Sequence, residues 1–169
     1  MSEAEYLALP EVKPYLEYVD GMVLQKPMAS YAHGTIAAEL IFELRTWTGA
    51  DGGSLGTEIG TREESAGNYL VPDVSYWAPG RARGNDTVPT LAVEVLSPGQ
   101  TMNELRAKCR SYRNEGVDVC WIIDPDRRVA EVLEDGRDAE PVPPDGALES
   151  PLLPGFSLAL QRLFAVLDR

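Results

Sequence analysis

The sequence predicts a single domain of the α/β (α+β) class, with a mixed β-sheet flanked by helices. The chain has 169 residues, of which 44% are hydrophobic, and this is enough for one sizeable core. Segments with the apolar spacing of helices alternate with short apolar segments typical of strands. We expect one domain over 1–169, with a hairpin at 15–27, a core at 30–133 and a C-terminal strand and helix at 134–169.

The first half is predicted to contain a hairpin, a long helix and two strands. The segment YLEYVDGMVLQKP (15–27) contains Asp20-Gly21, a dipeptide typical of tight hairpin turns. Ser30 is a suitable N-cap for a helix with one apolar face, and Gly49 ends that helix. The other predicted elements of this half are strands at 54–63 and 69–79, with a turn at 64–68.

The second half is predicted to contain a central strand, a helix, two further strands and a terminal helix. LAVEVL (91–96) is apolar except for its glutamate, as expected of a buried strand. Thr101 and Glu104 have the spacing of a capping box, so a helix begins there, and Gly116 ends it. The remaining elements are strands at 117–125 and 127–136 and a short helix near the C-terminus.

The composition predicts a cytoplasmic protein without a membrane segment. No apolar run approaches the ~20 residues that a membrane-spanning helix needs. The N-terminus is acidic and lacks the apolar core of a signal peptide. Cys109 and Cys120 lie in apolar segments, and we expect two reduced core thiols.

The formal net charge of −12 argues against sequence-blind binding of a phosphate backbone. Residues 79–128 differ from the rest, with eight basic and seven acidic side chains, and a polyanion would be repelled least there. The arginines of this part that could contact phosphate are Arg81, Arg83, Arg106 and Arg110. Ordinary surface charge is the alternative for each of them.

Two carboxylates stand out from their surroundings. Glu94 interrupts the apolar run LAVEVL, and a buried unpaired charge is costly. Asp73 follows Pro72 in the preceding strand, and consecutive strands are usually neighbours, so the two side chains can converge. They would repel each other unless a cation lies between them or one is protonated, and carboxylates suit Mg²⁺ or Mn²⁺. A buried ion pair without a metal is the alternative for Glu94.

Lys108 lies on the helix that follows Glu94. It is roughly 80° from the centre of the apolar stripe, at its border, so its stem can lie along the sheet. A solvated helix lysine is the alternative. An Asp, a Glu and a Lys converging on a metal are typical of phosphodiester hydrolysis.

The motifs PD (72–73) and EVL (94–96) resemble the signature of the PD-(D/E)XK nuclease superfamily. Leu96 stands where the parent motif has its lysine. A restriction-endonuclease-like branch of the superfamily carries this lysine on the following helix, where the present chain has Lys108. The ordered set LEYVDG, PDVSYW, LAVEVLSP and WIIDP resembles this branch over residues 15–133, with Met22 and Glu104 as departures from the usual Glu and Asp.

The resemblance implies a restriction-endonuclease-like fold and a set of site residues. Asp73, Glu94 and the backbone carbonyl of Val95 would hold Mg²⁺ or Mn²⁺. Lys108 would position or activate the attacking water. Glu17 and His33 would support the site as further members of the catalytic set. The alternatives are a solvent-facing strand residue for Glu17 and a local hydrogen-bonding group at the helix start for His33.

The sequence therefore predicts a metal-dependent endonuclease. DNA is the expected partner, with a homodimer as the expected assembly because many nucleases cut two strands symmetrically. Double-stranded DNA, single strands, RNA and junctions all stay open as substrates. The alternative is a catalytically silent interaction module with the nuclease fold, which the net charge of −12 favours. Hydrolysis of another phosphoester or of a glycoside by the carboxylate pair is a weaker third hypothesis.

Overall fold

The computed structural model describes residues 1–50, 52–62 and 67–169. Its helices are α1 (Glu3–Leu7), α2 (Tyr31–Thr48), α3 (Met102–Asn114) and α4 (Leu160–Ala165), followed by the 3₁₀ turn η1 (Val166–Asp168). Its strands are β1 (Leu16–Val19), β2 (Met22–Gln25), β3 (Ser54–Thr57), β4 (Val74–Trp77), β5 (Leu91–Val95), β6 (Val119–Asp124), β7 (Val129–Glu134), β8 (Glu140–Pro141), β9 (Ala147–Leu148) and β10 (Leu158–Ala159).

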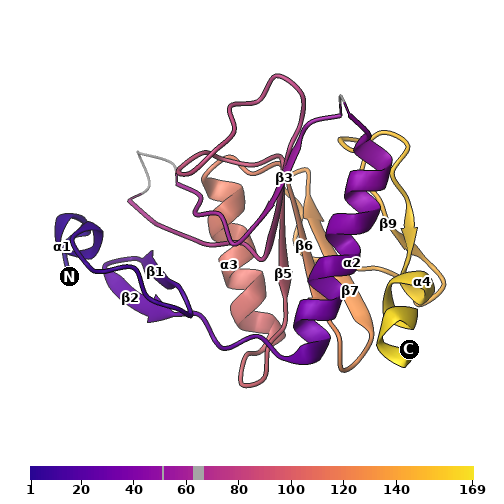
Figure 1. Cartoon of the computed structure of the whole chain (residues 1–169), viewed down its shortest axis with the longest axis horizontal. Coiled ribbons are helices and arrows are strands. Elements are labelled where there is room, and N and C mark those ends of the chain that lie inside the picture. The colour runs from indigo at the N-terminus through magenta and orange to yellow at the C-terminus, as the bar shows by residue number, and fades with distance from the viewer. Residues whose placement is uncertain (51, 63–66) are drawn as a thin grey trace.

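The centre of the fold is a six-stranded mixed sheet with the order β3-β4-β5-β6-β7-β8. Strands β5 and β6 are parallel, joined by helix α3, and the other neighbouring pairs are antiparallel. In Figure 1, α2 and α3 lie on either side of the sheet. The predicted class, a mixed sheet flanked by helices, is confirmed.

Each face of the sheet has its own core. Leu91, Val93 and Val95 of β5 point toward the core formed with α2, α4 and the C-terminal segment. Ala92 and Leu96 point toward the core under α3. Glu94 lies between them on the α3 side, because successive side chains of a strand alternate between faces. This alternation places a carboxylate beneath α3.

The N-terminal hairpin is a separate two-stranded sheet. Val19 pairs with Met22, so Asp20 and Gly21 form a two-residue turn. Both have positive φ, 49° and 83°, as this turn requires, and Gly21 adopts such a value without steric cost. Backbone hydrogen bonds in both directions between Tyr18 and the later Tyr69 attach the hairpin to the body of the domain.

Two predicted strands are shorter than expected. The strand predicted at 54–63 ends at Thr57, because Glu58 has a φ of 51° and leaves the extended conformation. The strand predicted at 69–79 is regular only over Val74–Trp77, since Pro72 has no N–H to donate to a ladder. Residues 69 and 70 instead make isolated bridges. Most of the turn predicted at 64–68 lies outside the described residues.

The other predictions of elements agree with the structure. Ser30 and Thr101 cap α2 and α3, and the capping box of Thr101 with Glu104 is present. Cys109 and Cys120 are buried free thiols, as expected. In the part of the chain that the structure describes, no helix has the length and hydrophobicity to cross a membrane.

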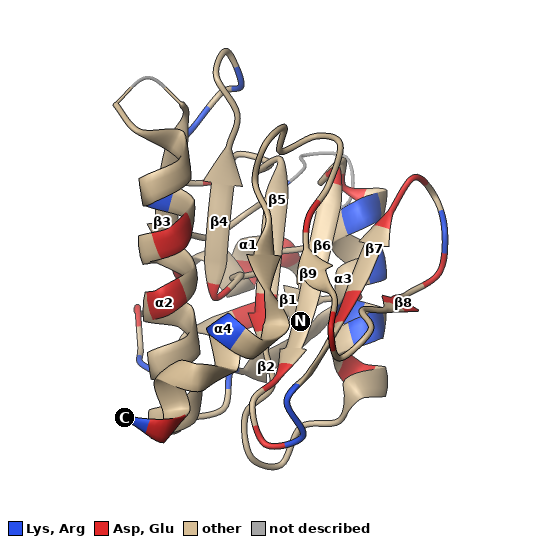
Figure 2. Ribbon diagram, turned by 90° about the vertical axis from the view of Figure 1, so that its right-hand side faces the viewer, with Lys and Arg blue, Asp and Glu red and all other residues tan. Residues whose placement is uncertain are grey.

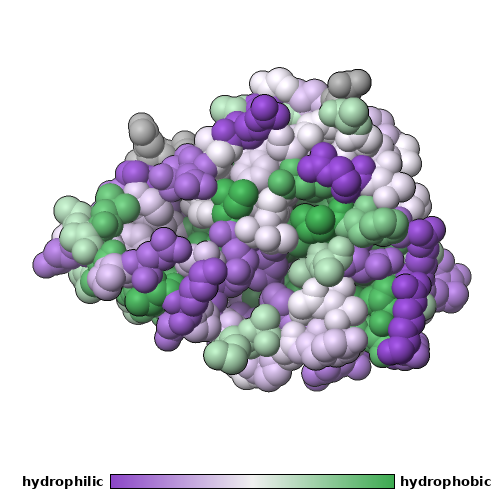
Figure 3. All heavy atoms as spheres, in the orientation of Figure 1, coloured by the Kyte–Doolittle hydropathy of each residue, from purple (hydrophilic) through white to green (hydrophobic). Residues whose placement is uncertain are grey.

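The surface charge is uneven. Basic side chains gather along α3, whereas acidic ones mark α2 and the loop after β7 (Figure 2). On the face shown in Figure 3, hydrophobic patches are separated by hydrophilic residues.

Candidate metal and phosphodiester site

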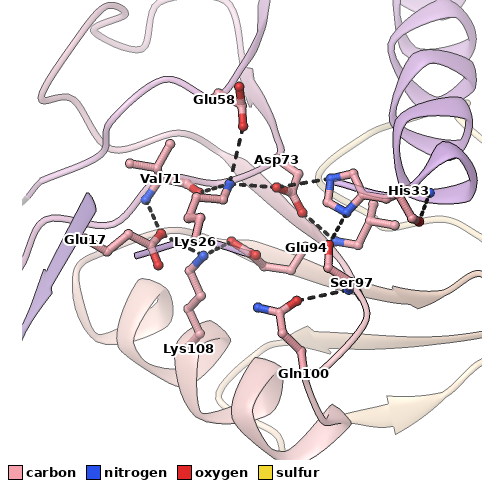
Figure 4. A network of polar contacts seen from close by, with 12 residues as sticks. Glu17, Lys26, His33, Glu58, Val71, Asp73, Glu94, Ser97, Gln100 and Lys108 are labelled. Carbon is pink, nitrogen blue, oxygen red and sulfur yellow. Dashed lines mark hydrogen bonds and ion pairs between the residues drawn. The ribbon is translucent and has the colours of Figure 1, made fainter. Parts of the chain in front are cut away.

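Asp73 and Glu94 lie side by side at the junction of β4 and β5. Val74 pairs with Val93, and the backbone N–H of Asp73 donates to the carbonyl of Val93 at 3.0 Å, which brings Asp73 next to Glu94. Both carboxylates are almost completely buried, with exposed fractions of 3% and 2%. The convergence predicted from the sequence is therefore present in the structure (Figure 4).

Asp73 uses its two oxygens differently. Oδ2 accepts a hydrogen bond from the backbone N–H of Val95 at 2.8 Å. Oδ1 accepts from the ammonium of Lys26 at 2.7 Å and lies 3.5 Å from Nε2 of His33. One oxygen is thus fixed by the neighbouring strand, and the other is held by side chains from the hairpin end and from α2.

His33 is oriented by contacts on both sides of its ring. Its backbone N–H donates to Oγ of Ser30, which starts α2, and its Nδ1 lies 2.8 Å from Oγ of Ser97. Since Nε2 faces a carboxylate, it carries the ring proton and Nδ1 accepts from the Ser97 hydroxyl. Gln100 in turn fixes Ser97, because its Oε1 accepts from the Ser97 backbone N–H at 3.0 Å.

Glu94 is held by groups from α3. Its Oε1 forms an ion pair with the ammonium of Lys108 at 2.8 Å and accepts a hydrogen bond from the hydroxyl of Tyr112 at 2.7 Å. These residues are four apart and share one face of the helix. The described residues place no hydrogen-bonding group on Oε2 of Glu94. One oxygen of this carboxylate is therefore available to a further ligand.

Glu17 joins the hairpin to the same cluster. Its Oε1 lies 2.7 Å from the ammonium of Lys108 and accepts from the backbone N–H of Val71 at 2.7 Å. Lys108 thus bridges Glu17 and Glu94 with only 12% of its side chain exposed. The border position predicted for Lys108 on α3 lets it reach the strands, and Figure 4 shows it pointing there.

A cavity of about 240 Å³ opens onto these groups. Asp73, Glu94, Lys26 and His33 line it, and so does Val95. A second hollow, of about 550 Å³, lies between the hairpin and α3 and is lined by Glu17 and Lys108. Lys26, Pro27 and Gln100 line both spaces. The site therefore has room for small ligands on both sides of Lys26.

The buried charges have shifted pKa values. Burial raises the pKa of Glu94 to about 7, Asp73 adds to this, and Lys108 opposes it. Burial also acts to raise the pKa of Asp73, but His33, Lys26 and Lys108 together outweigh it and hold that pKa well below the usual value. Burial acts to lower the pKa of Lys108, yet Glu17, Glu94 and Asp73 raise it, so its ammonium stays protonated.

The donor chemistry fits a hard divalent cation. The described residues contain no group of three or more His, Cys, Asp or Glu side chains that could hold a metal ion. A cation here would take its protein ligands from two carboxylates and a backbone carbonyl. Mg²⁺ binds in this manner, because it keeps several waters and needs only one or two carboxylates.

The four arginines predicted to contact phosphate do not share one environment. Arg81 forms an ion pair with Asp118 and donates to the carbonyls of Val88 and Gly116. Arg106 is paired with Glu131, and Arg83 donates to the Ser54 hydroxyl. Arg110 is exposed on α3 and makes no ion pair with a described residue. It is the arginine of the four with the freest side chain.

Four polar residues of the site were not found by sequence reasoning: Lys26, Glu58, Ser97 and Gln100. Lys26 stands two residues beyond the exposed Leu24, so the alternation of the hairpin strand predicts an exposed side chain. Its burial arises from contact with Val71 and Asp73, which are distant in the chain. The ring of Tyr112 is buried on α3, and its hydroxyl donates to Glu94.

The fold and the site together define a restriction-endonuclease-like protein. A family model described as "Uma2: Putative restriction endonuclease" matches residues 3–161. The chain belongs to the Uma2 family, and the resemblance to the restriction-endonuclease-like branch of the PD-(D/E)XK superfamily is confirmed.

Two solved structures are similar to this chain. A crystal structure described as a putative nuclease belonging to DUF820, from Anabaena variabilis ATCC 29413, has a TM-score of 0.87 at 24% identity and covers 99% of both chains. This likeness shows the fold. A cryo-EM structure of a DrdV–DNA complex has a TM-score of 0.40 at 18% identity, over 62% of this chain and 67% of that one. A comparison with curated proteins gives no match.

Proposed function

We propose that this protein is a metal-dependent endonuclease that hydrolyses phosphodiester bonds of DNA. The observation that carries the proposal is the convergence of Asp73, Glu94 and Lys108 on one site beside a cavity. Membership of the Uma2 family, whose model is described as "Putative restriction endonuclease", supports the same chemistry.

Asp73, Glu94 and the backbone carbonyl of Val95 are the residues that would hold Mg²⁺ or Mn²⁺. When bound, such a cation neutralises phosphate charge and lowers the pKa of a coordinated water. The free oxygen of Glu94 and the shared cavity lining of all three residues support this assignment.

Lys108 acts as a fixed positive charge and hydrogen-bond donor. Because its pKa is raised, its ammonium does not serve as the general base, and it orients the attacking water or stabilises negative charge on the phosphate. In the hydrolysis, a water oxygen bonds to phosphorus and gives up a proton to solvent, while the bond to the leaving oxygen breaks and that oxygen takes up a proton from solvent. Glu17 holds Lys108 in place, so it is a positioning residue.

His33 positions Asp73. Its Nε2–H faces Oδ1 of Asp73, and the Ser97 hydroxyl fixes the ring from the other side. This arrangement keeps Asp73 ionised and oriented, which a metal ligand requires.

Cleavage of supercoiled plasmid and of a single-stranded oligonucleotide, with Mn²⁺ or Mg²⁺, tests the proposal. We expect cutting by the wild type and loss of cutting in Glu94→Gln, Asp73→Asn and Lys108→Met, with folding intact. Unchanged cutting in all three variants contradicts it. A homodimer is part of the proposal for cleavage of both strands, and analytical ultracentrifugation with and without DNA tests it.

A catalytically silent interaction module is the second candidate. The observation in its favour is the net charge of −12, which opposes DNA binding. A module that binds proteins predicts negligible binding to any nucleic acid even at low salt, and tight, salt-dependent DNA binding contradicts that version.

A further inference from the structure

Lys26 is a second buried lysine at the site, distinct from Lys108. It follows β2 directly, and only 7% of its side chain is exposed. Its ammonium lies 2.7 Å from Oδ1 of Asp73 and donates to the carbonyl of Val71 at 2.8 Å. A third oxygen, Oε1 of Glu58, lies 4.0 Å away on a half-exposed side chain.

The two lysines leave their carboxylates in different states. Lys108 and Tyr112 both use Oε1 of Glu94, so a cation can approach Oε2 while these contacts persist. Asp73 differs, because Oδ2 accepts the backbone N–H of Val95, whereas Oδ1 accepts Lys26 and faces Nε2 of His33 at 3.5 Å. The Val95 N–H belongs to a strand and the His33 ring is held by Ser97, so Lys26 is the group that can move without disturbing either.

A cation on Asp73 therefore competes with Lys26. Two positive groups on one buried carboxylate repel each other strongly, since solvent screens them little. The Lys26 ammonium has space and an alternative partner. Lys26 lines both cavities of the site, and the half-exposed carboxylate of Glu58 lines the smaller one.

We propose that Lys26 is a built-in competitor for the metal site, whose ammonium occupies Oδ1 of Asp73 and must swing toward Glu58 before a divalent cation binds. This inference rests on the proposed metal site and adds its regulation. The pair of Lys26 and Asp73 keeps the buried carboxylate neutralised without a metal, at the expense of metal affinity. Binding of the cation and release of Lys26 are then one coupled event.

The test measures Mn²⁺ binding by isothermal titration calorimetry on the intact chain at pH 8. The variants are Lys26→Met, Glu58→Gln, their combination, and Lys13→Met as the control. Lys13 lies at the same cavity but is exposed and forms no ion pair with a described residue, so its removal changes the net charge equally. Glu94→Gln is measured in parallel to test the metal site itself.

We expect Lys26→Met to bind Mn²⁺ about tenfold more tightly than the wild type, and Lys13→Met to stay within about twofold. Glu58→Gln should bind about threefold more weakly than the wild type, because the displaced ammonium loses its partner. In the Lys26→Met background, Glu58→Gln should have no effect. Detectable Mn²⁺ binding by Lys26→Met, with none by the wild type, would also support the proposal that Lys26 competes with the metal.

If Lys26→Met binds Mn²⁺ equally to or more weakly than the wild type, Lys26 is not a competitor for the metal. The proposed metal site is still supported in that case, provided that Glu94→Gln binds Mn²⁺ more weakly than the wild type. If no variant binds Mn²⁺, the metal site is wrong and the proposed function fails with it. If Lys26→Met does not fold, Glu58→Gln decides, because unchanged affinity in this exposed variant contradicts the movement of Lys26.

Discussion

The ammonium of Lys108 lies 2.8 Å from Oε1 of Glu94, so a side chain of α3 supplies the positive charge that balances the carboxylate of the central strand. The parent PD-(D/E)XK motif places its lysine two residues after the glutamate, where this chain has Leu96, which packs beneath α3. The pair explains how Glu94 is tolerated at 2% exposure. It also places the Lys108 ammonium next to Glu94, which lines the smaller cavity together with Asp73 and Val95.

Replacement of Lys108 by methionine should lower the rate of metal-dependent cleavage by about 10²–10³-fold, the size typical of losing one electrostatic group in an active site. Plasmid cleavage under single-turnover conditions measures this. Arg137→Met is the matched control, because Arg137 is half exposed in the loop after β7 and its loss removes the same charge. Equal rates in the wild type and Lys108→Met would exclude a catalytic role for Lys108.

The raised pKa of Glu94 predicts a pH-dependent stability without metal. The pKa of Glu94 is about 7 in the folded protein, against an ordinary value of 4.5 for a glutamate, so ionisation of Glu94 opposes folding. Its favourable contribution is full below about pH 4.5 and is lost as the pH rises through 7. Between pH 4.5 and pH 8, the free energy of unfolding of the wild type should fall by about 2–3 kcal/mol relative to that of Glu94→Gln.

Urea unfolding of both proteins in EDTA, at intervals over this range, gives that difference directly. The pKa of Asp73 is lowered, so its effect on stability has the opposite pH dependence. Its ionisation stabilises the fold above the ordinary pKa of 3.8, and this stabilisation is lost at lower pH. A difference between wild type and Glu94→Gln that does not change with pH would show that Glu94 is ionised at every pH tested.

Tyr112→Phe removes the hydroxyl that donates to Glu94 at 2.7 Å. We expect the free energy of unfolding to fall by about 1.5–3 kcal/mol at pH 8, where the accepting carboxylate of Glu94 is charged. Tyr76→Phe is the matched control, because its hydroxyl donates to the neutral carbonyl of Gly52 at 2.8 Å and should cost about 0.5–1.5 kcal/mol. Denaturant unfolding compares them, and a smaller loss for Tyr112→Phe than for Tyr76→Phe would argue against a charged Glu94.

Much of the fold and the centre of the site can be predicted from the sequence. The alternation in LAVEVL indicates which residues share a face, and the capping box of Thr101 places α3 so that Lys108 reaches the sheet. Strand ends are predicted less well, because they depend on single backbone conformations such as the positive φ of Glu58. Lys26 is missed because only tertiary contact with Asp73, far along the chain, buries it.

Arg110 is the arginine from which we expect a contribution to DNA binding. Arg110→Ala should weaken binding of a DNA duplex uniformly across sequences and reduce the salt slope of log K by about one. Arg81→Ala should instead lower the free energy of unfolding, because Arg81 joins the loop after β4 to Asp118 and to the carbonyl of Gly116. Fluorescence anisotropy over a range of salt concentrations and urea unfolding measure these effects. Identical salt slopes for Arg110→Ala and the wild type would show that Arg110 does not contact DNA.

The central claim is that Asp73 and Glu94 hold one divalent cation. Crystals grown with Mn²⁺ and measured for anomalous scattering test it most directly. We predict one strong anomalous peak within about 2.5 Å of an oxygen of each carboxylate and of the Val95 carbonyl. A structure at high Mn²⁺ concentration without a peak there, or with its peak elsewhere, would contradict the account.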